Sequence, residues 1–212
     1  MTKKPARARR SDGEQTHAAI LDTAVRLASI EGLGGLSIGR LAQEVGVSKS
    51  GLYAHFGSKQ DLEMSIWAAA REIFEREVIE PALAAPDGLA RFEQLCERYL
   101  SYIERRVFPG GCFFAGMLAE FDARTGRGHD EIADDQREWN ALLDATAAAA
   151  QAAGELDPTA DLRQLVFDVA AAIQLANYYF VLFGNAGVID QARSSIRAAI
   201  SRSGGHPPHH AP

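Results

Sequence analysis

The stretch SIGRLAQEVGVSKSGLYAHFGSKQDL, residues 37–62, decides the fold of this chain. Its apolar residues recur at helical spacing and are interrupted by glycines. Ser37 is suited to cap the start of a short helix, and Gly46 is suited to end it. Ser48 caps a second short helix, which Gly57 ends. Two short helices joined by a tight, glycine-containing turn predict a helix-turn-helix.

Longer helices flank this stretch. A capping-box pattern predicts that a first helix begins between Ser11 and Thr16, and Gly32 is expected to follow its end. A second capping-box pattern at Ser58 begins a long helix, and Pro81 is expected to end it. Because β-branched runs are scarce and the breaks are regular, further helices are predicted at about 87–107, 110–125, 130–153, 159–184 and 187–202.

The predicted fold class is therefore all-α, with an N-terminal three-helix helix-turn-helix domain and a larger helical domain. The expected parts are a flexible basic arm and helix lead-in at 1–15, the helix-turn-helix domain at 16–62, the larger domain at 63–203 and a disordered tail at 204–212.

Charge is distributed unevenly between these parts. Residues 1–60 hold nine Lys and Arg against five Asp and Glu, a charge of +4, so the net −6 of the chain leaves −10 on the remainder. A basic end on an acidic body favours a polyanionic partner for that end alone. A solvated basic tail is the alternative.

Several classes of protein are disfavoured. The chain has no nucleophile elbow, phosphate loop or dinucleotide fingerprint, so we expect neither an enzyme nor a cofactor. Cys96 and Cys112 are too few for a disulfide framework or a zinc site, and no metal is expected. No apolar run approaches the roughly 18–20 residues of a membrane span. The expected location is a reducing cytoplasm.

The second short helix has side chains suited to DNA. Its first turn carries short or flexible residues that allow close approach to base edges: Ser48, Lys49, Ser50 and Gly51. Donors suited to phosphate oxygens follow: Tyr53, His55 and Lys59. Ser37 and Arg40 are expected on the same side, from the preceding helix. The alternative is an ordinary helical hairpin with a solvated polar face.

The same run closely resembles the DNA-binding signature of the TetR (tetracycline-repressor-like) family, with residues 16–62 matching in kind. The resemblance implies that Tyr53, His55 and Lys59 clamp the DNA backbone. It places Lys49, Ser50 and Arg40 nearest the bases, and Leu52 and Phe56 in the core. Gly39 stands where the family often has a polar residue, which argues against a base contact from position 39.

For the acidic body, the resemblance implies inducer binding and dimerisation. The segment from Leu165 to Phe183 is apolar nearly all round, so it must be covered on all sides. The helix at 187–202 covers part of it, and a second copy pairing both helices into a four-helix interface would cover the rest. A central core helix is the alternative.

Aromatic residues concentrate where the helices of the body are expected to converge. A mostly apolar pocket with a few polar groups is the usual small-molecule site. The candidate ligand-binding residues are Trp67, Tyr99, Tyr102, Phe113, Phe114, Met117, Trp139, Asn177 and Tyr178. The alternative is that this set is simply core.

Gly110 and Gly111 place Cys112 in or near the first turn of a helix, where a thiol can have a lowered pKa and become reactive. Cys112 is therefore a candidate redox switch, with a small buried residue as the alternative. The predicted function is a repressor released from a palindromic operator by a small, largely apolar ligand. The alternatives are a repressor switched through Cys112 and a helical small-molecule-binding adaptor without specific DNA binding.

Overall fold

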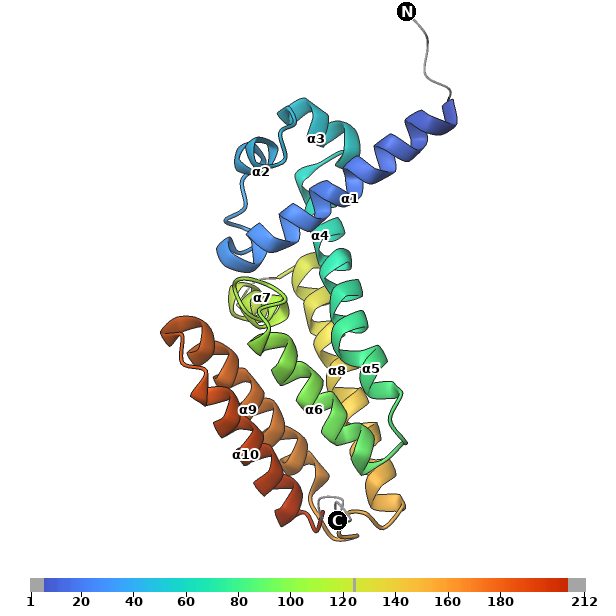
Figure 1. Ribbon diagram of the computed structural model, residues 1–212, viewed down its shortest axis with the longest axis vertical. Helices are drawn as coiled ribbons and strands as arrows, with labels where there is room; N and C mark the ends of the chain where they lie inside the picture. Colours follow the sequence, from blue (N-terminus) through green and yellow to red (C-terminus); the bar gives the residue numbers. More distant parts are fainter. Residues whose placement is uncertain (1–5, 124, 206–212) are drawn as a thin grey trace, which may run out of the picture.

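The computed structural model describes residues 6–123 and 125–205, and all regular structure in these residues is helical (Figure 1). The predicted all-α fold class is confirmed. The elements in chain order are α1 (Ala6–Glu31), α2 (Ile38–Glu44), α3 (Lys49–Phe56), α4 (Lys59–Phe74), the π-helical segment η1 (Glu75–Ile79), α5 (Glu80–Leu83), α6 (Leu89–Glu104), α7 (Phe113–Phe121), α8 (Arg127–Ala152), α9 (Leu162–Phe183) and α10 (Gly187–Arg202).

Helices α1, α2 and α3 lie together at one end of the molecule, against the start of α4 (Figure 1). The three predicted caps are confirmed: the hydroxyls of Ser37, Ser48 and Ser58 each accept a hydrogen bond from the backbone N–H three residues on, at 3.0–3.1 Å. Each bond satisfies a donor that has no partner within its helix. The caps therefore fix where α2, α3 and α4 begin.

The first helix is longer than predicted. It begins at Ala6 rather than between Ser11 and Thr16, so Ser11 lies inside the helix and the capping-box prediction there is wrong. The arm was predicted because residues 1–10 lack an apolar face. Such a face is needed for burial but not for helix formation, and Ala and Arg are good helix formers. Residues 1–5 of the predicted arm and 206–212 of the predicted tail lie outside the described residues.

Pro81 does not end the long fourth helix. The chain passes from α4 through the π-helical turns of η1 into α5, where Pro81 occupies the first turn. A proline is tolerated at that position because it has no N–H to donate to the preceding turn. The wider π turn just before it lets the backbone continue in the same direction.

The acidic body consists of α4 to α10. Helices α6 and α8 pack against each other, and α9 and α10 form an adjacent antiparallel pair (Figure 1). Asp161 caps α9 by accepting from the N–H groups of Arg163 and Gln164 at 3.0 and 3.1 Å, and Gly184 ends it in a left-handed conformation. The predicted helices of the body are all present: α6, α7 and α9 are shorter than predicted at both ends, α8 begins three residues earlier and ends one residue earlier, and α10 has the predicted bounds.

Helix α9 is long and apolar enough to cross a membrane by length and composition, with a mean hydropathy of 1.6 over an 18-residue window. The prediction that no stretch reaches this size is therefore wrong for α9. This is weak evidence for a membrane span, because a single helix of this length and composition also occurs in soluble proteins, and one side of α9 packs along α10, α6 and α8. The buried side chain of Asn177 on α9 also needs a hydrogen-bond partner, which the protein interior supplies.

Candidate DNA interface and ligand cavity

The predicted DNA-contacting residues lie together on α2, α3 and the start of α4, and none of them is buried. The first turn of α3 is exposed at Ser48, Lys49 and Ser50, and the hydroxyls of the two serines lie 3.0 Å apart. Tyr53, one turn on, is 45% exposed. On the opposite face of the helix, Leu52 and Phe56 are buried in the core, as predicted.

Gly39 on α2 leaves space for the side chain of Lys49. A Cβ at position 39 would lie 3.1 Å from Cε of Lys49 and 3.3 Å from its Nζ, so the bare backbone of α2 leaves room for the lysine to cross it. The sequence interpretation considered position 39 only as a lost contact. The structure gives the glycine a role in where the Lys49 ammonium lies.

Three further side chains near α3 already have partners. Arg40 pairs with Glu31 at the end of α1, at 2.8 Å, and Lys59 with Glu63 at 3.5 Å. The His55 ring lies 6.2 Å from that of His17, which stacks on Phe56 at 4.5 Å. His17 was not singled out from the sequence, because a lone histidine in a helix carries no signal of which ring it will meet.

A cavity of about 240 Å³ lies in the body between α4, α6, α7 and α8. Four of the nine predicted ligand-binding residues line it: Trp67, Tyr99, Phe114 and Trp139. The predicted set did not include the other lining residues, which are Arg71, Phe74, Glu75, Ile79, Leu118, Ile132, Asp135, Gln136, Glu138 and Leu142.

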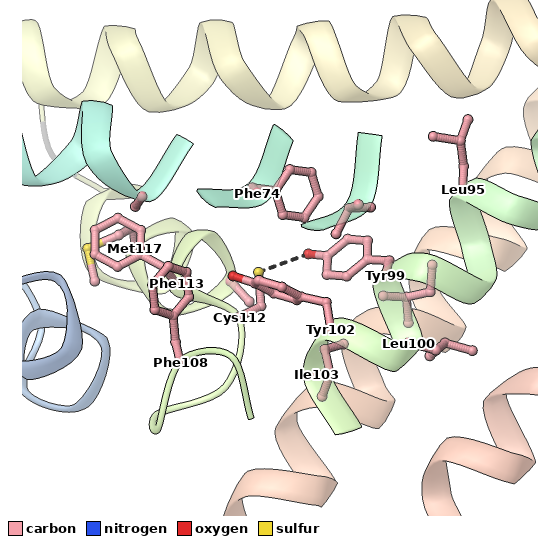
Figure 2. Close-up of a cluster of buried hydrophobic side chains, with 14 of the residues drawn as sticks. Phe74, Leu95, Tyr99, Leu100, Tyr102, Ile103, Phe108, Cys112, Phe113 and Met117 are labelled. Atoms are coloured by element: carbon pink, nitrogen blue, oxygen red, sulfur yellow. Dashed lines mark hydrogen bonds between the residues drawn. The ribbon is translucent and has the colours of Figure 1, made fainter. Parts of the chain in front are cut away.

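The other five predicted ligand-binding residues lie elsewhere. Tyr102, Phe113 and Met117 are at most 2% exposed and belong to the core, where they form part of the buried cluster in Figure 2. Tyr178 is 42% exposed on the outer face of α9. Helical spacing predicts which residues face inward, but it does not predict which of the inward-facing residues border a cavity.

Asn177 is buried but does not line the cavity; its side-chain carbonyl accepts the backbone N–H of Cys112 at 2.8 Å. This bond joins α9 to the start of α7. Gly111 makes the approach possible: it has φ +87°, and a Cβ there would lie 2.6 Å from Oδ1 of Asn177 and 2.5 Å from a methyl group of Val181. The hydrogen bond to Cys112 requires Asn177, and the close approach of Asn177 requires a glycine at position 111, so the two residues occur together.

Cys112 is the N-cap residue of α7, close to where it was predicted, but its chemistry is the opposite of that expected for a redox switch. The thiol is 2% exposed and lies 3.1 Å from the hydroxyl of Tyr99 (Figure 2). Burial raises the pKa of Cys112 above its ordinary value, although contacts with Tyr99 and the first turn of α7 act in the other direction. The alternative interpretation, a small buried residue, is confirmed.

A charged group forms one wall of the cavity. The Arg71 guanidinium pairs with Asp135 at 2.6 Å, with Glu75 at 3.4 Å and with Glu138. The indole N–H of Trp67 donates to Asp135. Burial raises the pKa of Asp135 above its ordinary value, against the effects of Trp67 and Arg71.

The pKa of Arg71 responds to the same group: burial lowers it, but the nearby carboxylates outweigh that effect and raise it above its ordinary value. The sequence offered one signal of this group, the helical i, i+4 spacing of Arg71 and Glu75. Asp135 and Glu138 lie more than 60 positions further along the chain, so only the fold brings them to Arg71.

Besides the packing of α4 on α1 and α3, hydrogen bonds from α7 and from the loop before it join the body to the end of α1. The Glu120 carboxylate, at the end of α7, accepts the backbone N–H groups of Leu33 and Gly34 at 3.0 and 2.8 Å. The backbone N–H of Gly110 donates to the Ser29 hydroxyl near the end of α1, at 3.2 Å. Because Phe114 and Leu118 of α7 line the cavity, one short helix contacts both the cavity and the turn between α1 and α2.

Two family models match the sequence. One, described as bacterial regulatory proteins of the tetR family, matches residues 20–63, and the other, a tetracyclin repressor-like C-terminal domain, matches residues 88–196. The HTH-type transcriptional regulator AcrR of Shigella flexneri is 39% identical over 62 residues, which is 29% of each chain. The alignment thus spans less than a third of that relative's length.

Solved structures share the fold over most of the chain. A TetR transcriptional regulator from Chloroflexus aurantiacus has a TM-score of 0.83 at 22% identity, covering 91% of this chain and 98% of its own. AibR in complex with isovaleryl coenzyme A and operator DNA has a TM-score of 0.69 at 21% identity, covering 85% and 95%. A regulator from Saccharomonospora viridis in complex with choline has a TM-score of 0.69 at 23% identity, covering 89% and 96%.

Proposed function

The chain belongs to the tetracycline-repressor-like (TetR) family of bacterial regulatory proteins, and on that premise we propose that it is a dimeric repressor, released from a palindromic operator by a small ligand. The observation that carries the proposal is the exposed first turn of α3, where Lys49 and Tyr53 lie on a helix with a capped start and a buried opposite face. The proposal assigns no catalytic step and places the protein in the bacterial cytoplasm.

The roles proposed at this surface follow from side-chain chemistry. Lys49, Ser50 and Arg40 lie nearest the bases, and Tyr53, His55 and Lys59 hold phosphate oxygens, with Ser37, Ser48 and Gly51 bringing the backbone close. The ion pairs of Arg40 with Glu31 and of Lys59 with Glu63 are exposed and therefore weak. Either cation can exchange its carboxylate for a phosphate at little cost.

A second copy of the chain is the partner proposed for the outer face of α9. That face carries large exposed apolar side chains: Phe167, Leu175, Tyr178, Tyr179, Val181, Leu182 and Phe183. A contiguous apolar patch of this kind marks an interaction site. Pairing α9 and α10 with the same helices of a second copy would hold two α3 helices at a fixed separation, and entry into successive major grooves requires about 34 Å.

Ligand control is proposed through the cavity. A ligand that fits the cavity better in one arrangement of α4 and α7 shifts the population toward it and changes the spacing of the two α3 helices. The fold neighbours do not fix the ligand's chemistry, since isovaleryl coenzyme A and choline differ in charge and size. The class of ligand must therefore come from the side chains of this chain.

The DNA interface can be tested on an operator obtained by selection from a random DNA pool, which also gives the half-site spacing. We expect the double variant Lys49→Ala with Tyr53→Ala to lose binding at least tenfold, since a base contact is worth about 1–3 kcal/mol. Arg98→Ala, which removes an exposed cation from α6, is the matched control and should bind as wild type does. Unchanged binding by the double variant would refute the interface.

A further inference from the structure

The wall of the cavity is largely aromatic. Five rings from four helices line it: Trp67, Phe74, Tyr99, Phe114 and Trp139. Several meet edge to face; the ring centres of Phe74 and Trp139, and of Tyr99 and Trp139, are 5.4 Å apart with planes at 81° and 84°. The faces of aromatic rings attract a cation placed over them, most strongly for Trp.

The wall of the cavity carries more negative than positive charge. Among the described residues that line the cavity, Glu75, Asp135 and Glu138 carry carboxylates, and Arg71 carries the single cationic group. With all four ionised, the wall has a formal charge of −2. This balance already favours a positively charged ligand over a neutral or negative one.

Arg71 is not free to receive an anion. Its guanidinium contacts all three carboxylates, with Asp135 at 2.6 Å, and the indole of Trp67 donates to the same Asp135. An anionic ligand would have to displace a carboxylate from Arg71 and leave it next to the ligand's own charge. A cation, by contrast, can approach Glu138 or Glu75, which are 62% and 46% exposed, without breaking the contact with Asp135.

A neutral ligand would leave the excess charge uncompensated. The side chain of Asp135 is only 15% exposed, and a ligand that fills the cavity removes water from it and from its neighbours. Removing water from an ionised carboxylate costs free energy unless a positive charge replaces the water. A ligand that is both apolar and positively charged satisfies the rings and the carboxylates together.

We propose that this cavity binds an organic monocation: an ammonium group with apolar substituents, lying among the aromatic rings beside Asp135, Glu138 and Glu75. The inference rests on the proposed function, because it names the ligand class of the same regulatory site. It also narrows the sequence prediction of a largely apolar ligand, since the positive charge becomes part of what is recognised.

The chain provides its own reporter. Trp67 and Trp139 are its two tryptophans, and both line the cavity, so the intrinsic tryptophan fluorescence comes entirely from its wall. We would titrate the whole chain, without DNA, with three probes of similar size. The cation is benzyltrimethylammonium, the neutral probe is its carbon isostere neopentylbenzene, and the anion is 4-tert-butylbenzoate. The cation should bind at least tenfold more tightly than the neutral probe, and the anion more weakly still.

Two variants test the contribution of charge. Asp135→Asn keeps the shape of the wall and removes one charge, and it should weaken binding of the cation about tenfold while leaving the neutral probe unchanged. Asp134→Asn is the matched control: it makes the same change one position away, on an exposed side chain paired with Arg137 and outside the cavity wall. Thermal unfolding of each variant would establish that it is folded, and the comparison of probes on the wild-type protein needs no variant.

The outcomes separate this inference from the proposed function. Equal or tighter binding of the neutral probe, or tighter binding of the anion, would overturn the cation assignment while leaving operator binding intact. Binding of the cation that does not release the operator would uphold the assignment and refute control of DNA binding through this cavity. Loss of operator binding in the α3 double variant tests the DNA interface separately.

Discussion

At the residue scale, Cys112 illustrates how burial decides the chemistry of a side chain. Its place at the start of α7 favours a reactive thiolate, since the helix end attracts negative charge. Its burial among aromatic residues favours the thiol, and burial is the largest effect on its pKa. Cys96 is likewise buried, and burial raises its pKa as well.

We therefore expect both thiols of the native protein to react with iodoacetamide at pH 8 far more slowly than the same thiols in guanidinium-denatured protein, as measured by mass spectrometry. The folded state holds these protons more tightly than the unfolded chain does. The stability that this provides is fully present below the ordinary thiol pKa and is lost as the pH rises through the raised values. Rapid labelling of Cys112 in the native protein would contradict the burial argument and revive a redox role.

At the element scale, α7 is a short helix with contacts at both ends. Its N-terminal end is held by the bond from Cys112 to Asn177, and its C-terminal end holds the turn after α1 through Glu120. Two of its side chains, Phe114 and Leu118, line the cavity between these points. Movement of this helix is thus one route, beside α4, by which an occupied cavity could affect the helix-turn-helix.

Replacing Glu120 by Ala removes both acceptors of the Leu33 and Gly34 N–H groups. A hydrogen bond to a charged group is worth about 1.5–3 kcal/mol, but the bond from Gly34 is exposed and that from Leu33 only partly buried, so we expect the free energy of unfolding in urea to fall by about the value of one such bond. If α7 transmits the ligand signal, the variant should also bind the operator yet respond less to ligand. Glu120→Gln, which retains one acceptor oxygen, serves as the control and should lose less stability. No loss in the Ala variant would count against the contact.

The elements that were correctly predicted are those with local signals. Ser37, Ser48 and Ser58 cap their helices through bonds to residues three positions away, so the sequence contains all that is needed. The passage of the chain through Pro81 depends on a π-helical turn for which there was no comparable local signal. The group around Arg71 depends on α8 lying beside α4, which no short stretch of sequence specifies.

At the scale of the whole molecule, most of the large apolar side chains that are exposed in the described residues lie on the outer face of α9. The inner face packs against α6, α8 and α10, while Phe167, Leu182 and Phe183 are 65–72% exposed. Exposed side chains of this size are unfavourable in water, and burying each of them stabilises an interface by about 1.5–3 kcal/mol. The sequence could not identify this face, because the residues of α9 are apolar on nearly every side. The packed structure shows which side is left exposed.

We expect Leu182→Arg to dissociate the dimer, shifting the mass measured by light scattering at micromolar concentration from two chains toward one. Operator binding should fall with it, since a monomer presents a single α3. Leu83→Arg changes an exposed leucine of α5 in the same way and is the matched control, expected to remain dimeric. A wild-type protein that is already monomeric would refute both the interface and the spacing mechanism.

The hydrogen bonds that the Leu33 and Gly34 N–H groups donate to Glu120 have a practical consequence for building hybrid regulators. A cut after residue 62 would transplant the DNA-reading helices but leave behind the carboxylate and the Gly110 N–H that fasten the end of α1. A graft onto a foreign sensor would then recognise the same operator but no longer respond to the new host's signal. The interchangeable unit should instead include matched residues at 29–34 and 110–120, chosen as a pair from one parent.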